Sequence, residues 1–286
     1  MKELLVISGK GGTGKTCFTA SFAVLAKNKL LTDLDVDAAD LHLLLSPKMK
    51  EIHEFWSGQV AVIDEAKCTD CGLCREQCRF DAITGTRVDP IACEGCGFCA
   101  RICPEEAISM TDTMSGHWFI SDTAYGTMVH ARLGIAQENS GKLIALIRKE
   151  ARQLAEQKGL DIIISDGPPG IGCPVISSLS GVDLALIVTE PTMSGIHDME
   201  RVLELCRHFS VPAQVCVNKY DINEANTERI TQFCEEQGLP TPTLVPYDNA
   251  VNEALAKGIP VVNYTKNGAA AKITALWENL ATELIQ

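Results

Sequence analysis

The chain has 286 residues, of which 46% are hydrophobic and 22% charged, a composition that is ordinary for a globular protein with a buried core. Its formal net charge of −12, without any Lys/Arg stripe, argues against a nucleic-acid partner, because such binding depends on neutralising phosphates. No apolar run approaches the roughly 20 residues that cross a bilayer. The N-terminal apolar stretch is also too short for a signal peptide. We therefore expect a cytoplasmic protein that binds neither nucleic acid nor membrane.

The first elements expected along the chain are a strand, a glycine-rich loop and a helix. Residues 3–8 form an apolar run of strand length, about 15–27 form the helix, and 30–34 form a second apolar strand. After a cysteine-rich interruption, strand-like pieces at 116–121 and 128–133 lead back to this pattern.

Strands and helices then alternate to the C-terminus. The strands are expected at 161–165, 183–189, 213–218 and 243–246, and the helices at 142–158, 194–209, 225–237, 250–257 and 269–285. This alternation predicts βαβ units, and hence an α/β fold with a mostly parallel sheet and helices on both faces. Ligand-binding residues are expected where the strands end on the loop side of that sheet.

Eight of the 13 cysteines lie in an internal repeat between about residues 59 and 112. Each copy has the spacing C-x2-C-x2-C-x3-C, and the second copy begins 25 residues after the first. In two-cluster ferredoxins the fourth cysteine of such a run ligates the other [4Fe–4S] cluster. The expected assignment is therefore crossed. One cluster takes Cys68, Cys71, Cys74 and Cys103, and the other takes Cys93, Cys96, Cys99 and Cys78.

A pair of zinc sites is the alternative reading of this repeat. Zinc motifs usually have two C-x2-C pairs separated by a longer loop, so the triple spacing favours clusters. The glycines after Cys71 and Cys96 would let the backbone turn tightly and direct its N–H groups at cluster sulfurs. One departure from the ferredoxin pattern is Arg79, which stands where a proline would follow the fourth cysteine. We expect it to alter the local polarity and potential without removing a ligand.

The glycine-rich loop fits the phosphate-binding pattern G-x4-G-K-[ST], and it follows a strand and opens a helix. Its backbone N–H groups would converge on phosphate oxygens, assisted by the helix N-terminus. Lys15 should reach the β- and γ-phosphates, and the Thr16 hydroxyl should bind Mg²⁺. The alternative is a glycine-rich turn that binds no nucleotide. The residues expected to contact ATP here are Gly9, Lys10, Gly11, Gly12, Thr13, Gly14, Lys15, Thr16 and Cys17.

Carboxylates follow two of the predicted strands. Asp33 and Asp35 end the second strand, and Asp166 ends the apolar run before a Gly-Pro-Pro-Gly turn. At a strand end that faces the phosphate loop, such groups can orient water and hold Mg²⁺ through water. Asp37 and Asp40 are equally well explained as solvated side chains or as caps of the next turn.

The second loop lysine, Lys10, resembles the deviant Walker A signature of the MinD/ParA superfamily. The resemblance implies that Lys10 reaches the phosphates of a nucleotide in the facing subunit, so that a homodimer sandwiches ATP. It also implies that Asp35 orients the attacking water, that Asp33 is a secondary Mg²⁺ contact, and that Asp166 is a Walker B residue. Catalysis would then consist of positioning and charge neutralisation, with Lys10, Lys15, Asp35 and Asp166 as the catalytic residues.

The same resemblance implies a purine site. Asn218 follows another apolar strand and resembles the family's adenine-contacting asparagine, with a strand-end cap as the alternative. A second base-contacting loop would contain Pro246, Tyr247 and Asp248.

With its cysteine repeat, the whole chain resembles MinD-superfamily P-loop ATPases that contain an inserted ferredoxin domain. This predicts a discontinuous ATPase domain, 1–58 and 113–286, and a small inserted α+β ferredoxin-like domain at 59–112. The expected function is a Mg-dependent ATPase, slow without a partner. It would couple ATP binding and hydrolysis in a dimer to electron transfer through two clusters to a protein partner.

Two alternative functions remain open. The first is an ATP-dependent carrier or assembly scaffold for iron–sulfur clusters, against which the lack of a C-terminal C-x-x-C counts. The second is a positioning ATPase of the MinD/ParA kind, against which the lack of a basic surface or a membrane helix counts.

Several further residues have less specific explanations. Cys173 is expected to be a small buried residue, with a dimer-bridging cluster ligand as the alternative. His117 and His130 flank the return from the cysteine repeat, and the polar stretch 138–142 is either a helix cap or a contact to the insert or a partner. The remaining cysteines fit core positions: Cys17, Cys206, Cys216 and Cys234.

Overall fold

The computed structural model describes residues 1–134 and 139–285. The chain divides into two compact units. The first unit is formed by Met1–Ile52, Trp118–Ala131 and Ser140–Gln286, and the second by His53–His117 and Arg132–Asn139. Each unit is described separately below.

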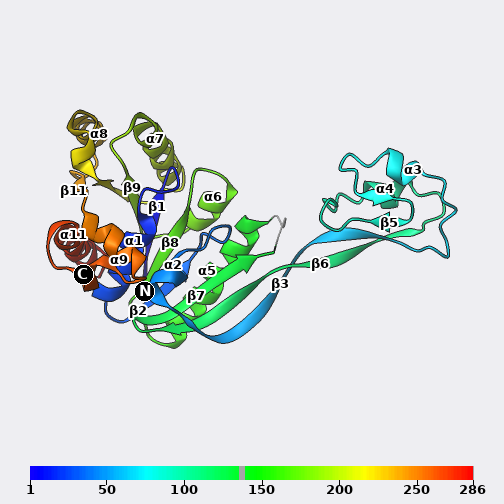
Figure 1. The fold of residues 1–286 in the computed structure, drawn as a ribbon, viewed down its shortest axis with the longest axis horizontal. Helices are drawn as coiled ribbons and strands as arrows, with labels where there is room; N and C mark the ends of the chain where they lie inside the picture. Colours follow the sequence, from blue (N-terminus) through cyan, green and yellow to red (C-terminus); the bar gives the residue numbers. More distant parts are fainter. Residues whose placement is uncertain (135–138, 286) are drawn as a thin grey trace. The chain divides into compact units, whose positions relative to one another are not determined.

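The first unit is built on a mostly parallel sheet (Figure 1). Its strands are β1 (Lys2–Ser8), β2 (Lys29–Asp33), β7 (Gly126–Leu133), β8 (Ile162–Pro169), β9 (Leu184–Thr189), β10 (Ala213–Asn218) and β11 (Thr243–Val245). Two long strands of the same sheet, β3 (Lys48–Ile63) and β6 (Ile108–Thr123), and the end of β7 extend into the second unit. Nine strands are hydrogen-bonded in the order β11-β10-β9-β1-β8-β2-β7-β6-β3. Every neighbouring pair from β11 to β7 is parallel. The predicted α/β sheet is therefore confirmed.

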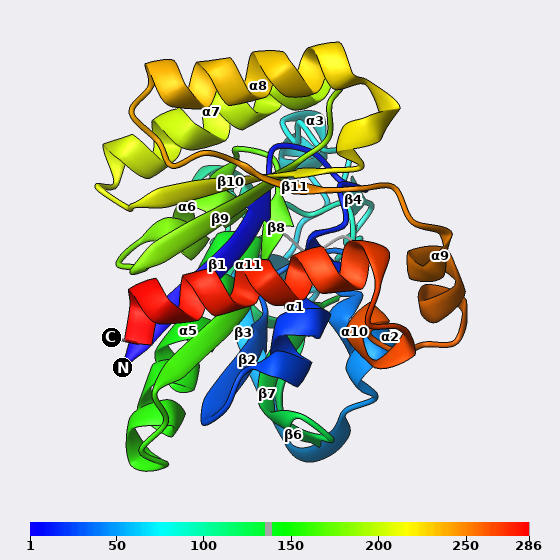
Figure 2. The same ribbon diagram turned by 90° about the vertical axis from the view of Figure 1, so that its left-hand side faces the viewer.

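Helices cover both faces of this sheet, as predicted (Figure 2). They are α1 (Lys15–Leu25), α2 (Leu41–Leu45), α5 (Ser140–Gln157), α6 (Cys173–Leu179), α7 (Met193–His208), α8 (Glu224–Glu236), α9 (Asn249–Ala256), α10 (Val261–Tyr264) and α11 (Gly268–Ile285). Helix α1 packs against α2, α10 and α11, whereas α5 and α6 pack against each other and against β8. The central strands β1 and β8 are apolar along most of their length because both of their faces are covered.

Strand β8 continues beyond the point where the sequence predicts a turn. The expected strand ended at Asp166, but the structure extends it through Gly167 to Pro169. A Cβ atom on Gly167 would lie 2.4 Å from the Ile7 side chain, so only glycine allows β8 to run this close to β1. The glycine and prolines predicted that the strand would end here. Gly167 instead allows β8 to pack closely against β1.

A buried ion network lies beneath the sheet. Glu3 on β1 accepts hydrogen bonds from Arg148 Nε at 3.0 Å and Nη2 at 2.9 Å, and it also binds Arg152. Arg148 Nη1 in turn donates to the carbonyl oxygens of Ser177 and Ser180. These bonds tie α5 to β1 and to the end of α6, and they satisfy the donors of a buried guanidinium.

The second unit contains short elements around the cysteine repeat. They are α3 (Leu73–Glu76), the antiparallel pair β4 (Ile83–Thr84) and β5 (Arg87–Val88), and α4 (Phe98–Ile102). Gly72 and Gly97 precede α3 and α4 with φ angles of 79° and 69°, which is the left-handed region that favours glycine. The tight turns predicted after Cys71 and Cys96 are therefore present.

A small apolar core supports these elements. The repeat-related isoleucines Ile83 and Ile108 are buried together with Ala61 and Ile63. Six of the repeat cysteines pack against this core: Cys68, Cys74, Cys78, Cys93, Cys99 and Cys103.

Candidate nucleotide and cysteine sites

The glycine-rich loop passes from β1 into α1 in the conformation that a phosphate loop requires. Gly12 and Gly14 have φ angles of 81° and 97°. No side chain caps the N-terminus of α1. The first N–H groups of a helix have no partner within the helix, so they are available to a bound anion. A Cβ atom on Gly9 would lie 2.4 Å from that of Asp198, and one on Gly14 would lie 2.7 Å from Asn218 Nδ2. The glycines thus permit both the turn and its close approach to α7 and β10.

The side chains of Asn218 and Thr13 both lie at the loop, and they differ in their hydrogen bonds. Asn218 Nδ2 donates to the Thr13 carbonyl oxygen at 2.8 Å, and Asn218 Oδ1 accepts from the Lys219 N–H. Thr13 is 1% exposed, and its Oγ1 has no hydrogen-bond partner among the described residues. A buried hydroxyl without a partner is costly, and a ligand in the loop would provide one.

Thr16 and Asp166 meet directly at the start of α1. The Thr16 hydroxyl donates to Asp166 Oδ2 at 2.7 Å, and the Thr19 hydroxyl, one turn further along α1, donates to Asp166 Oδ1 at 2.9 Å. Burial raises the pKa of Asp166 to about 6, although Lys15 and the two hydroxyls favour its charged form. A carboxylate and a hydroxyl at hydrogen-bond distance form an oxygen donor set of the type that binds Mg²⁺.

Asp33 lies beside Asp166 at the ends of neighbouring strands. It is 1% exposed and accepts hydrogen bonds from the N–H groups of Asp35 and Leu41. Burial, followed by the charge of Asp166, raises its pKa well above the ordinary value. Asp35 is less buried, and its pKa is raised by desolvation but lowered by nearby Lys15. The predicted carboxylates therefore gather at one edge of the sheet with a buried lysine.

Asp37 and Asp40 lie at the solvent-exposed side of this cluster, where their charges add to the raised pKa of Asp35. Both side chains are exposed, and Asp40 precedes α2 without capping it by its side chain.

Lys10 is held by residues of its own chain. Its Nζ atom donates to Thr192 Oγ1 and Ser194 Oγ, each at 3.2 Å, and lies 3.8 Å from Glu190 Oε2. Glu190 Oε1 also pairs with Lys219 Nζ at 2.6 Å. These polar groups sit at the end of β9 and the start of α7, so the predicted signature lysine belongs to a defined polar cluster.

The loop predicted to contact the base has structural roles of its own. Asp248 caps α9 by accepting from the Ala250 N–H at 2.9 Å, and it also accepts from the Ala269 N–H at 3.0 Å. Tyr247 is 50% exposed, and its N–H donates to Asp221. Pro246 directly precedes Tyr247. The turn therefore holds an exposed aromatic ring on a backbone that the bond to Asp221 fixes.

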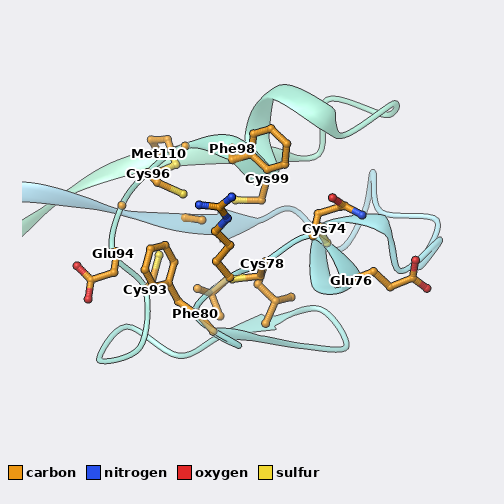
Figure 3. A pocket seen from close by; sticks show the side chains of 18 residues that line it. Cys74, Glu76, Cys78, Phe80, Cys93, Glu94, Cys96, Phe98, Cys99 and Met110 are labelled. Carbon is orange, nitrogen blue, oxygen red and sulfur yellow. The ribbon is translucent and has the colours of Figure 1, made fainter.

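The repeat cysteines line two cavities of the second unit. The first cavity has a volume of about 660 Å³ and is lined by Cys78, Cys93, Cys96 and Cys99 together with Cys74 (Figure 3). The second, of about 20 Å³, is lined by Cys68, Cys71, Cys74 and Cys103. We call these the Cys93 site and the Cys68 site. Each lining contains all four cysteines of one crossed set.

The environment of the thiols is consistent with this grouping. Desolvation raises the pKa of Cys74, with Cys68 and Cys71 adding to the shift, and the same holds for Cys99 with Cys93 and Cys96. The Asp70 N–H donates to Cys68 Sγ and the Ala107 N–H to Cys103 Sγ, each at 3.4 Å. In the part of the chain that the structure describes, no three His, Cys, Asp or Glu side chains are gathered as a single metal ion would need.

Cys173 corrects one expectation, since it is exposed at the start of α6 rather than buried. The other cysteines predicted to be in the core, Cys17, Cys206, Cys216 and Cys234, are buried. Burial raises the pKa of Cys17 to about 12, so its thiol remains protonated.

Other predicted positions carry no cofactor chemistry here. His130 Nε2 lies 2.9 Å from Ser121 Oγ and its ring stacks on Phe119, while His117 ends a segment of the second unit. Of the polar stretch 138–142, Glu138 lies outside the described residues, and Ser140 is the first residue of α5.

Sequence reasoning missed two groups of residues. Thr19 lies three residues after Thr16, a spacing that brings two hydroxyls to one helix face and could have indicated a shared partner. Glu190 directly follows β9, and a carboxylate at a strand end beside the loop was an available signal. Thr192 and Ser194 gave no such signal, because serine and threonine before a helix are explained by capping, which Thr192 also performs.

The family model described as the CobQ/CobB/MinD/ParA nucleotide-binding domain matches residues 4–261. The uncharacterized protein MJ0578 of Methanocaldococcus jannaschii is 37% identical over 227 residues, covering 78% of this chain and 80% of that protein.

Two solved structures share the fold. The septum site-determining protein MinD of Pyrococcus horikoshii in complex with Mg-ADP has a TM-score of 0.59 at 18% identity, covering 98% of this chain and 95% of that chain. The MinC:MinD cell division complex of Aquifex aeolicus gives 0.59 at 19% identity, covering 100% and 98%. Of the helices that the structure describes, none is both long and apolar enough to span a membrane.

Proposed function

Because the chain belongs to the CobQ/CobB/MinD/ParA nucleotide-binding family, we propose that it is an ATPase of the MinD/ParA type that binds Mg-ATP at the Gly9–Thr16 loop. The observation that carries the proposal is the pairing of Thr16 with buried Asp166 beside Lys15, directly below a loop whose glycines leave its N–H groups accessible. In the solved relatives, the P. horikoshii protein is described with Mg-ADP.

The chain's own groups fit a magnesium nucleotide. Backbone N–H groups of the loop and Lys15 would bind the phosphates, and the orphan Thr13 hydroxyl lies in the same loop. Mg²⁺ would be held by Thr16, with Asp166 and, more remotely, Asp33 acting through water. The cation would neutralise charge on the phosphates and on two carboxylates whose burial disfavours ionisation.

Hydrolysis of the γ-phosphate requires a positioned water more than a strong base. Asp35 is the best-placed carboxylate for this role, because it is half-buried, lies near Lys15 and has only backbone N–H partners. Attack by this water would release phosphate and ADP. Asn218 and the turn of Pro246, Tyr247 and Asp248 would border the base, since Asn218 already touches the loop and Tyr247 is exposed.

Lys10 would act on the nucleotide of a second copy. Its present partners, Thr192, Ser194 and Glu190, hold it on the edge of the site rather than over the loop. Release of this contact in an ATP-sandwiched homodimer would add a cation beside the γ-phosphate, where charge develops. The nucleotide state would thereby control the surface offered to a protein partner, in keeping with the MinC:MinD complex of A. aeolicus.

Lys15→Ala tests the nucleotide site. Removing the buried phosphate-binding charge should weaken Mg-ATP binding at least about 100-fold, a loss of roughly 3 kcal/mol for a charge-assisted contact. Isothermal titration calorimetry and phosphate release measure binding and turnover. Lys27→Ala is the matched control, because Lys27 is exposed just after α1 and should leave the affinity within about twofold. Equal affinities in the parent and in Lys15→Ala would reject the site.

The comparisons favour a positioning-type ATPase over an electron carrier, since the solved relatives are cell-division proteins. A specific observation supports a second candidate, an iron–sulfur ATPase that transfers electrons to a protein partner. It is the division of the eight repeat cysteines between two cavities in the crossed sets that two-cluster ferredoxins use. Residues 59–112 would then be an inserted ferredoxin-like domain between ATPase segments 1–58 and 113–286.

The spacing of the cysteines favours [4Fe–4S] clusters over single zinc ions. A cubane binds four thiolates at four separate irons. The lining of each cavity includes the four cysteines that one such cluster would take. Bound clusters would supply one-electron chemistry. A carrier or scaffold that passes clusters to an acceptor uses the same ligands and differs only in how tightly it retains them.

Anaerobic purification tests the cluster sites. We expect about eight irons per chain and the broad visible absorption of iron–sulfur proteins. Cys96→Ser and Cys71→Ser should each remove about half of the iron, and Cys173→Ser should remove none because Cys173 lies outside both cavities. Stoichiometric zinc, or an iron content unaffected by the first two substitutions, would contradict the cluster reading. Transfer of iron to an apo-acceptor would identify a carrier.

A further inference from the structure

The two cysteine sites differ in the residues that follow the fourth cysteine of each repeat copy. Cys78 is followed by Arg79 and Phe80, and both line the Cys93 site. Cys103 is followed by Pro104 and Glu105, and both line the Cys68 site. The first copy therefore places the cation Arg79 at the Cys93 site where the second copy has Pro104, and the second copy places the anion Glu105 at the Cys68 site where the first has Phe80.

The remaining lining residues do not cancel this difference. Glu76 and Glu94 border the Cys93 site, but their carboxylates point away from its cysteines (Figure 3). The Cys68 site is bordered by Asp70 as well as Glu105. Among the described residues that line either cavity, Arg79 is the only cation.

A positive charge beside an iron–sulfur cluster favours its reduced form. Reduction adds one negative charge to the cluster, and an opposite charge nearby stabilises that charge while carboxylates destabilise it. Arg79 is exposed, so solvent and salt weaken its effect.

The same site has the larger cavity of the two. Its cavity measures about 660 Å³ against about 20 Å³ for the Cys68 site. Phe80 and Phe98, both labelled in Figure 3, line it and are 43% and 48% exposed.

Resting on the cluster sites proposed above, we propose that Arg79 is a positioning residue that makes the Cys93 site the more easily reduced of the two. Clusters held by the two cysteine sets would supply one-electron chemistry, and an external one-electron reductant such as dithionite would provide the electron. Arg79 would stabilise the negative charge that reduction adds at the Cys93 site.

A reductive titration of the anaerobically purified full chain with dithionite, followed by electron paramagnetic resonance, tests this assignment. The parent should show two steps. Arg79→Gln should shift the reduction equilibrium of the higher step about tenfold towards the oxidised form. For a one-electron couple this lowers the reduction potential by about 59 mV. Arg79→Lys should restore most of it, because the charge is retained.

Two further variants separate the effect from general charge and folding changes. Arg101→Gln removes an arginine of α4 that lines neither cavity and should leave both steps in place. Glu105→Gln should raise the lower step only. Iron-loaded protein in which Arg79→Gln moves neither step, or moves both steps equally, overturns the role of Arg79. Protein without iron instead overturns the cluster sites, and with them this assignment.

Discussion

Asp33 and Asp166 show the conflict between stability and function at the scale of single residues. Both carboxyl groups are almost fully buried at adjacent strand ends, and burial raises the pKa of each. A carboxyl whose folded-state pKa is raised holds its proton more tightly when folded. Its contribution to the free energy of unfolding therefore falls as pH rises from the ordinary value of 3.8 to about 6, the pKa of Asp166. Above pH 6 the charged pair destabilises the free protein, and bound Mg²⁺ would offset that cost.

Asp166→Asn should consequently stabilise the metal-free protein. The amide oxygen can accept from one threonine hydroxyl and the amide N–H can donate to the other hydroxyl, without carrying charge, so we expect a gain of roughly 3 kcal/mol at pH 7.5 and roughly half of that at pH 5. Urea unfolding in EDTA at both pH values measures this, and Mg-ATP should stabilise only the parent.

Asp37→Asn is the matched control, since Asp37 is exposed on the same segment and should change stability by less than about 0.5 kcal/mol. If Asp166→Asn destabilised the metal-free protein equally at both pH values, the carboxylate would be a structural acceptor rather than a charge kept for a cation.

Arg148 on α5 shows how one residue joins several elements. Its guanidinium is 7% exposed and binds Glu3 on β1 and two carbonyls at the end of α6. Arg148→Met should lower the free energy of unfolding by roughly 3 kcal/mol or more, because two carbonyls would lose this donor and Glu3 would lose two hydrogen bonds in a buried place. Arg152→Met should cost much less, since Arg152 is 39% exposed and water can replace it. Chemical denaturation measures both variants, and equal losses would show that the network does not depend on burial.

At the scale of helices and strands, the sequence predicted most of the fold. Apolar strands separated by amphipathic helices identified the sheet, and the termini of α7, α8 and α9 fall within one residue of expectation. The failures have physical causes. Gly167 predicts a turn by its residue type, but its contact with β1 depends on tertiary packing. Cys173 resembles a core residue, and only the placement of α6 exposes it.

The candidate site also has parts that the sequence predicted and parts that it did not. The spacing of the loop and cysteine motifs is local, so it predicted which residues gather at Asp166 and in the two cavities. The partners of Lys10 lie about 180 residues later in the sequence, shortly after β9. No local pattern therefore links them to the loop.

For the whole molecule, the central claim is that ATP controls the association of two copies through Lys10. In the free chain Lys10 is bound by Thr192, Ser194 and Glu190. Binding of a second copy would exchange these contacts for phosphate oxygens of the facing nucleotide. Lys10 would give up two hydroxyl contacts and a 3.8 Å contact with the Glu190 carboxylate for charge-assisted contacts with phosphate oxygens, so the exchange is expected only when ATP is present.

Analytical ultracentrifugation with Mg²⁺ and a non-hydrolysable ATP analogue tests this claim most directly. The parent should sediment as a single chain of 30.9 kDa with ADP and as twice that mass with the analogue. Lys10→Ala should bind the analogue with an affinity within about threefold of the parent and remain a single chain, because Lys10 acts on the nucleotide of the other copy. A parent that stays monomeric with the analogue, or a Lys10→Ala variant that dimerises as well as the parent, would contradict the account.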